Sequence, residues 1–184
     1  GKWFTFREYM SKMAEAGCST NIAPLVTHGA IRIAVMAFDD RPPTPGELGL
    51  MKLLIAEAME AGAFGMSTGL IYPPCIFAET KEIIELCRVV AIYNGLFVTH
   101  IRGEGNSLLE AVDEALETGM KAGVRTHISH HKATGKPNWG KTKSTLRMIE
   151  EASDQGLEVT FDQYPYTAGA TVLVTLLPPW THEG

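Results

Sequence analysis

Cysteine is scarce in this sequence, and the few cysteines form no short motif. The 184 residues contain only 3 cysteines, Cys18, Cys75 and Cys87, with no CxxC spacing among them. An odd number without such a spacing argues against the disulfide framework of small secreted domains. The composition therefore predicts a cytoplasmic protein whose thiols stay reduced and buried.

Basic clusters and long apolar runs are lacking as well. The formal net charge of −5 argues against a nucleic-acid-binding surface, and no apolar run is long enough for a membrane span. Apolar residues make up 45% and charged residues 20% of the chain, as in ordinary globular domains. We expect a single domain over residues 1–184. Because the chain opens with Gly1 and no start methionine, we also expect it to be a segment of a longer protein.

Short apolar runs alternate with helical patterns along the chain. The predicted strands cover residues 21–26, 63–67, 96–101, 124–130 and 157–162, and helical patterns fill most of the intervals. Alternation with short loops, and strand starts about thirty residues apart, are typical of βαβ units. Such units require parallel strands joined by right-handed crossovers. The sequence therefore predicts an α/β fold, although the tail over residues 164–180 is not assigned.

One helix has a particularly clear beginning. Thr44 is a good N-cap, Pro45 suits the first helical position, and Glu47 completes a capping box. These signals predict a helix over residues 45–60. Its apolar spacing indicates a buried side made of Leu50, Leu53, Leu54 and Ala58.

Two architectures fit the alternation of strands and helices. One is an open, doubly wound sheet, which usually carries a glycine-rich phosphate turn after its first strand; the run Thr27-His28-Gly29-Ala30 does not make one. The other is a partial, about five-stranded segment of an eightfold TIM-like (β/α)8 barrel.

Histidines stand at the ends of two successive predicted strands. His100 ends the third strand and His130 the fourth, and in barrel enzymes the active site lies at the carboxyl ends of the strands. Neutral imidazole is a common metal ligand, so the pair predicts a shared metal centre. His131 remains an alternative to His130, since only one of two adjacent strand residues faces the site. His127 is expected on the opposite face from His130 if the strand is regular.

Other polar residues follow the same strand ends. Lys132 is placed to meet a substrate carboxylate, Arg102 and Glu104 either line the rim or pair with each other, and Asp162 closes the fifth strand. A carboxylate at the position of Asp162 can bind a metal, act as a base or orient a histidine. The phenols of Tyr72 and Tyr164 are candidate donors to a bound anion, and His28 follows the first strand as a further rim histidine.

Four segments containing these residues resemble a known family. They are Gly65-Met66-Ser67-Thr68-Gly69-Leu70-Ile71-Tyr72-Pro73-Pro74, Thr99-His100-Ile101-Arg102, Ser129-His130-His131-Lys132 and Asp162-Gln163-Tyr164-Pro165-Tyr166. Their order and spacing resemble the N-acyl-D-amino-acid deacylases (D-aminoacylases) of the amidohydrolase superfamily, from about Phe4 to Trp180.

The resemblance implies a metal-dependent hydrolase on a (β/α)8 barrel, of which this chain is a partial, about five-stranded segment. It also implies a small-molecule N-acyl amino acid as substrate and one or two zinc ions. His100 and His130 match the family's strand-end zinc ligands, Tyr72 and Lys132 match residues that hold the substrate carboxylate, and Tyr164 matches a residue near that pocket. Arg102 is added as a substrate-binding candidate because it lies at the same rim.

The resemblance also places part of the family's machinery outside this chain. The HxH motif and the bridging cysteine would precede Gly1, and the catalytic aspartate would follow Gly184, so no catalytic residue is predicted here. Cys75 stands where the family often has glycine, and Ala170 stands where a serine is expected. We therefore expect the segment alone to have little or no activity.

Three alternative roles remain open. In the first, the parent protein is a dihydroorotase-like or hydantoinase-like hydrolase of cyclic amides. In the second, the chain is a non-catalytic α/β binding module. A partial barrel also exposes sheet edges, which favours homo-oligomers. Neither a nucleic acid nor a membrane is expected as a partner.

Overall fold

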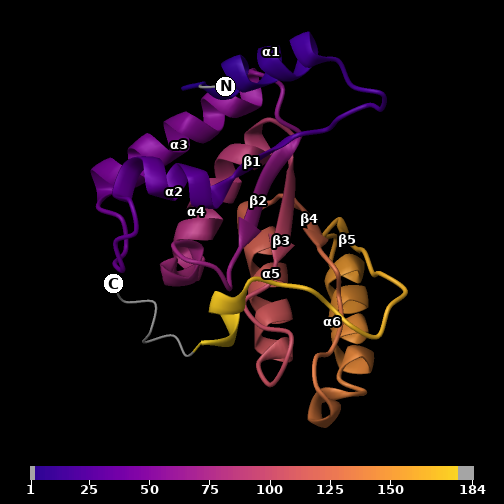
Figure 1. Cartoon of the computed structure of the whole chain (residues 1–184). Coiled ribbons are helices and arrows are strands. Elements are labelled where there is room, and N and C mark those ends of the chain that lie inside the picture. The colour runs from indigo at the N-terminus through magenta and orange to yellow at the C-terminus, as the bar shows by residue number, and fades with distance from the viewer. Residues whose placement is uncertain (1–2, 178–184) are drawn as a thin grey trace.

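Five parallel strands form one sheet in the order of the sequence (Figure 1). The computed structural model describes residues 3–177, apart from the side chains of residues 174 and 176. The strands are β1 (Leu25–Thr27), β2 (Gly65–Gly69), β3 (Leu96–His100), β4 (Arg125–Ile128) and β5 (Val159–Phe161). Each strand pairs in parallel with the next one along the chain. This consecutive order is that of a barrel segment, because a doubly wound sheet reverses its strand order at a switch point.

Helices connect the strands, and each helix from α2 to α5 packs against the next helix in the chain. They are α1 (Phe6–Ala16), α2 (His28–Met36), α3 (Pro45–Glu60), α4 (Thr80–Ile92), α5 (Leu108–Ala122) and α6 (Thr142–Asp154). Short 3₁₀ turns are η1 (Cys75–Phe77), η2 (Lys136–Asn138) and η3 (Leu173–Leu176). Within residues 3–177, none of the helices has the length and apolar character that a bilayer crossing needs.

The five predicted strands are all present, although their limits differ by a few residues. The first is the most displaced, because β1 begins only after Pro24. Proline has no N–H to give to a sheet ladder, and Pro24 contributes only its carbonyl, which accepts a hydrogen bond from Phe64 N at 2.8 Å. Helices α1 and α2 were not predicted. α1 buries no residue, and α2 begins directly after β1 with no intervening loop.

The start of α3 was predicted correctly, but of the four residues expected on its buried side only Ala58 is buried. Thr44 and Glu47 form both hydrogen bonds of the capping box. Its buried residues are Met51, Ile55, Ala58 and Met59, whereas Leu50, Leu53 and Leu54 are 55%, 67% and 39% exposed. α3 is apolar on most of its circumference, so the sequence pattern does not indicate which side meets the sheet.

The two faces of the sheet carry different side chains. One row of neighbouring residues is buried against the helices: Val26, Met66, Phe97 and Thr126. A second buried pair on this face, Thr68 and Thr99, is joined by a 2.9 Å hydrogen bond between its hydroxyls. Since side chains alternate along a strand, Val98 and His127 point to the other face, where His100 also lies.

Candidate metal centre

The imidazoles of His100 and His130 meet at the carboxyl ends of β3 and β4. Their ring centroids are 4.5 Å apart, and His100 Nδ1 faces His130 Nε2 within hydrogen-bonding distance. Parallel pairing of β3 with β4 brings the two strand ends to the same edge of the sheet. The structure thus brings together the two histidines that the sequence analysis selected.

A change of backbone direction after β4 aims His130 at its neighbour. β4 ends at Ile128, and His130 has a φ of 41°, in the left-handed region. Asp162, just past β5, accepts a hydrogen bond from His130 N at its Oδ1, at 2.8 Å. Its Oδ2 lies 2.8 Å from His127 Nε2. Asp162 therefore orients the turn that carries His130, which is one of the roles proposed for it from the sequence.

The other two histidines of this segment have separate environments. His131 is buried, with Nε2 2.7 Å from Thr145 Oγ1 of α6, so it points away from His100. His127 also approaches Thr160 Oγ1, at 2.7 Å from its Nδ1. The expectation that His127 and His130 lie on opposite faces assumed a regular strand, and the strand stops before His130.

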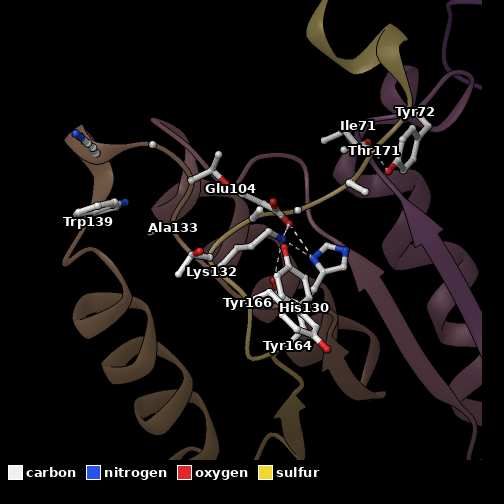
Figure 2. Close-up of a pocket in the computed structure, with 17 residues that line it drawn as sticks. Ile71, Tyr72, Glu104, His130, Lys132, Ala133, Trp139, Tyr164, Tyr166 and Thr171 are labelled. Atoms are coloured by element: carbon white, nitrogen blue, oxygen red, sulfur yellow. Dashed lines mark hydrogen bonds and ion pairs between the residues drawn. The ribbon is translucent and has the colours of Figure 1, made fainter.

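Glu104 is the residue at this site whose role the sequence analysis missed. Its Oε1 lies 2.8 Å from His130 Nδ1 and 2.5 Å from Lys132 Nζ. Lys132 Nζ also donates to the His130 carbonyl oxygen at 3.0 Å. Figure 2 shows the three side chains meeting beside the ring of Tyr164. The signal in the sequence was the position of Glu104, four residues after His100 in the same loop.

Arg102 does not take part in this cluster. Its Nε and one terminal nitrogen donate to Glu114 at 2.9 Å each, and its terminal nitrogens also reach the carbonyls of Ile76 and Ala78. The alternative pairing of Arg102 with Glu104 was wrong, since each has another partner. Arg102 thus joins α5 to the loop after β2 and does not line the pocket described below.

A pocket of about 630 Å³ opens beside the histidine pair. Its wall contains three of the residues selected from the sequence, Tyr72, Lys132 and Tyr164, together with His130 and Glu104. Lys132 Nζ lies 5.3 Å from the centroid of the Tyr164 ring, a cation–π distance. The Tyr72 hydroxyl lies across the pocket, 3.1 Å from Thr171 Oγ1 (Figure 2). A cationic amine and two phenols therefore face one cavity.

The two imidazoles have the donor chemistry of a zinc site. Burial lowers the pKa of His100, and the neighbouring His130 lowers it further, which favours the neutral ring that binds metal. His130 Nδ1 lies 2.8 Å from Glu104 Oε1 and 3.0 Å from Lys132 Nζ, while its Nε2 faces His100. A carboxylate behind a histidine in this way is typical of metal ligands.

Two histidines are, however, fewer protein ligands than a zinc site usually has. Catalytic zinc sites generally have three protein ligands. Among residues 3–177, no cluster of three or more His, Cys, Asp or Glu is arranged to hold a metal ion. The described residues therefore fit one side of a zinc site and leave the remaining ligands to be supplied from elsewhere.

Comparison with known proteins yields several related deacylases. No family model matches the chain. A D-aminoacylase of Alcaligenes xylosoxydans xylosoxydans is 40% identical over 168 residues, 91% of this chain and 34% of that protein. An N-acyl-D-aspartate deacylase and an N-acyl-D-glutamate deacylase of the same organism are 39% and 42% identical, over 94% and 84% of this chain and 34% and 32% of those proteins. The chain thus spans about a third of the length of these relatives.

Solved structures show the same relationship. A D-aminoacylase described as defining a novel subset of amidohydrolases superposes with a TM-score of 0.86 at 40% identity, over 90% of this chain and 35% of that one. The N-acyl-D-glutamate deacylase of Bordetella bronchiseptica, complexed with zinc and a phosphonate inhibitor, gives 0.85 at 39% identity, over 88% and 34%. An L-hydantoinase of Arthrobacter aurescens gives 0.53 at 18% identity, over 88% and 36%, and shares the fold alone.

The similarity to these deacylases is consistent with the arrangement of residues at the carboxyl ends of the strands. The strand order is that of a barrel segment, and a pair of facing imidazoles lies beside a lysine-containing pocket. Over 90% of its length this chain is similar to about a third of a solved D-aminoacylase, at 40% identity.

Proposed function

We propose that this chain is an internal part, residues 1–184, of the catalytic barrel of a longer zinc-dependent amidohydrolase. That protein would hydrolyse the amide bond of N-acyl-D-amino acids. The observation that carries the proposal is the convergence of His100 and His130 beside the pocket that contains Lys132. The identity of about 40% to three deacylases supports it.

His100 Nδ1 and His130 Nε2 are the proposed metal ligands. Zinc bound there would lower the pKa of a bound water and polarise the amide carbonyl. Glu104 would orient the His130 ring from the side of Nδ1, and Asp162 would hold the backbone turn from which His130 projects. The catalytic aspartate implied by the resemblance is not assigned to any residue of this chain.

Lys132, Tyr72 and Tyr164 are the proposed substrate-binding residues. The ammonium of Lys132 would bind the carboxylate of the N-acyl amino acid, and the phenols would donate to the same group. Glu104 holds Lys132 in place before the substrate enters. Fixing the carboxylate places the neighbouring amide close to the histidine pair, and positioning of this kind lowers the barrier to reaction.

We also propose a cytoplasmic location for this protein. Cys18, Cys75 and Cys87 are free thiols, as is usual in a reducing compartment. Cys18 is exposed, contrary to the expectation that all the thiols are buried, and Cys75 and Cys87 are buried.

Zinc titration of the chain tests the metal ligands directly. We expect weak binding by calorimetry, because two histidines make an incomplete site, and loss of that binding in His100→Ala and His130→Ala. His127→Gln is the matched control, because it removes a nearby imidazole that does not face the pair and keeps an N–H donor for Asp162. Equal zinc affinity in the wild type and the His100→Ala variant would contradict the assignment.

Steady-state kinetics of the longer parent protein tests the substrate contacts. Lys132→Ala should lower kcat/KM for acylated D-amino acids by about 10- to 100-fold, the effect of losing a charge-assisted hydrogen bond. Lys136→Ala is the matched control, because Lys136 lines the same pocket without contacting His130 or Glu104, and a change of less than about 3-fold is expected. High turnover by the 184-residue chain alone, abolished by His100→Ala, would refute the proposal that it is an incomplete barrel.

A further inference from the structure

The loop between β2 and α4 carries Tyr72, one of the proposed substrate-binding residues, into the pocket. Both ends of this loop are attached to the rest of the fold. At its start, Leu70 N donates to the His100 carbonyl oxygen at 3.0 Å. Just past its end, Glu82 of α4 accepts a hydrogen bond of 2.6 Å from the fully buried Arg32. The middle of the loop, between these two attachments, is held by a third contact.

The guanidinium of Arg102 makes that contact. One terminal nitrogen donates to the Ile76 carbonyl oxygen at 3.0 Å, and the other donates to the Ala78 carbonyl oxygen at 2.8 Å. Glu114 of α5 accepts from Nε and from the second terminal nitrogen, at 2.9 Å each. The carboxylate thus sets the plane of the guanidinium, and the rigid fork then meets two carbonyls of the loop at η1. The single nitrogen of a lysine has no such fork.

The backbone of the loop continues this connection from η1 to the pocket. Ile76 N donates to the Tyr72 carbonyl oxygen at 2.9 Å, and Tyr72 N donates to the Gly69 carbonyl oxygen at 3.0 Å. The Tyr72 ring lies directly against Gly69, where a Cβ would come within 2.8 Å of its Cδ2 atom. The phenol oxygen lies 3.1 Å from Thr171 Oγ1 in the pocket wall (Figure 2). A continuous series of contacts therefore leads from Arg102 to the phenol.

We propose that Arg102 is a positioning residue, which holds the Tyr72 phenol at a fixed place relative to the metal centre. Arg102 follows His100 by two residues, so this contact links the segment of a proposed metal ligand to the loop of a proposed substrate contact. The inference rests on the proposed function, because the phenol meets a substrate only if the pocket binds an N-acyl amino acid. Arg102 does not line the pocket, and it acts on the substrate through the loop.

Hydrogen–deuterium exchange of the chain tests the structural step by itself, without zinc or substrate. Arg102→Lys keeps the charge but loses the planar fork. The backbone amides of residues 70–78 should then exchange at least about tenfold faster, because the loop opens more often. Those of residues 125–128 in β4 should change by less than about twofold. Equal exchange of residues 70–78 in the wild type and the variant would overturn the proposal.

A double-mutant cycle in the longer parent protein tests the effect on the substrate. Arg102→Lys should lower kcat/KM for acylated D-amino acids by about 10-fold, chiefly through a higher KM, because a displaced phenol binds the substrate less well. The Tyr72→Phe background already lacks the phenol hydroxyl, and there the same substitution should change kcat/KM by less than about 2-fold. A role confined to stability predicts equal losses in both backgrounds, and that result would also overturn the proposal.

Two controls separate this effect from general damage. Arg88→Lys changes an exposed arginine of α4 that pairs with Glu85, and it should leave exchange and kinetics unchanged within about twofold. The zinc affinity of the Arg102→Lys chain should equal that of the wild type, because the histidine pair is untouched. Loss of zinc binding would place the defect in the metal centre and contradict the proposal.

A second variant covers the case in which Arg102→Lys does not fold, as judged by circular dichroism. Glu114→Gln removes the charge that orients the guanidinium, and it should change exchange and kcat/KM in the same directions. Unchanged exchange of residues 70–78 in a folded Glu114→Gln chain would then overturn the proposal. A parent protein inactive on acylated D-amino acids would refute the proposed function, whereas the exchange measurement would still decide whether Arg102 holds the loop.

Discussion

Glu82 is the central residue of the most deeply buried charged group in the described part of the chain. Burial would raise the pKa of its carboxyl, but the hydrogen bonds and charges of His28 and Arg32 outweigh burial and lower that pKa from its ordinary value of 4.5. Breaking such a group leaves an uncompensated charge inside the protein. Glu82 therefore matters more to folding than its polar character alone would indicate.

Replacing Glu82 should be strongly destabilising. Glu82→Gln leaves Arg32 buried without its counter-ion, and the free energy of unfolding at pH 7 should fall by about 3 to 5 kcal/mol. Glu85→Gln on the same helix is the control. Its carboxylate meets Lys52 and Arg88 near the surface, so a loss below about 1 kcal/mol is expected. Equal losses in urea titrations would contradict this assignment.

The acid dependence of stability should have a defined sign. Because the pKa of Glu82 is lower in the folded than in the unfolded chain, the ionised carboxylate stabilises the fold above about pH 4.5. That contribution is lost as the pH falls from 4.5 through the folded-state pKa. The destabilisation caused by Glu82→Gln should therefore shrink between pH 6 and pH 3.5 in urea titrations. If the stability difference between the wild type and Glu82→Gln grew as the pH fell, the pKa of Glu82 would have to be higher in the folded than in the unfolded chain.

The sequence identified the two histidines of the candidate metal centre but not the hydrogen bonds and ion pairs that hold them. His100 and His130 were selected from their positions at strand ends, which depend only on local pattern. The partnership of Glu104 with Lys132 and His130 depends on the path of two loops, which no periodicity encodes. The positive φ of His130 is equally hidden, because a non-glycine residue gives no signal for that conformation.

At the scale of helices and strands, capping residues were more informative than apolar spacing. Thr44 and Glu47 form the predicted capping box of α3. This motif is a local hydrogen-bonding arrangement, so the sequence alone indicates it. Leu53, by contrast, was expected inside and is 67% exposed. Burial depends on which neighbour covers a helix, and α3 offers apolar side chains in nearly every direction.

The end of α5 depends on a left-handed residue. Gly123 has a φ of 66° at the C-cap, where any side chain meets steric strain. Gly123→Ala should therefore lower the free energy of unfolding by about 1 to 2 kcal/mol. Gly49→Ala in α3 is the matched control: a Cβ there has nothing within 4 Å, and it should stabilise the chain by about 0.5 to 1 kcal/mol. Thermal unfolding of both variants measures the difference, and a neutral Gly123→Ala would contradict the strain.

At the scale of the whole molecule, the sheet is open at both sides. β1 pairs only with β2, and β5 only with β4, within the described residues. Unpaired strand edges are templates for pairing with another chain. The sequence predicted five strands, whereas a closed barrel of this type needs eight. For this reason the sequence indicated a segment of a barrel and not a complete one.

The chain should self-associate as its concentration rises. Sedimentation velocity between 10 and 200 µM, on the order of the range in which exposed edges pair, should show a growing fraction of dimers or larger species. A second measurement at high salt should leave this association in place, because it depends on backbone hydrogen bonds more than on charge. A single monomeric boundary at every concentration would show that the edges are protected.

The consecutive strand order has a consequence for how the molecule assembles. Because every strand pairs with its successor along the chain, the loops to be closed are short, and low contact order favours rapid folding. Successive βα units can therefore add to the sheet one after another during folding, and local unfolding would begin at the edge strands β1 and β5. His100 ends β3 and His130 follows β4, two strands that are paired on both sides. The two histidines therefore lie in the part of the sheet that should unfold last.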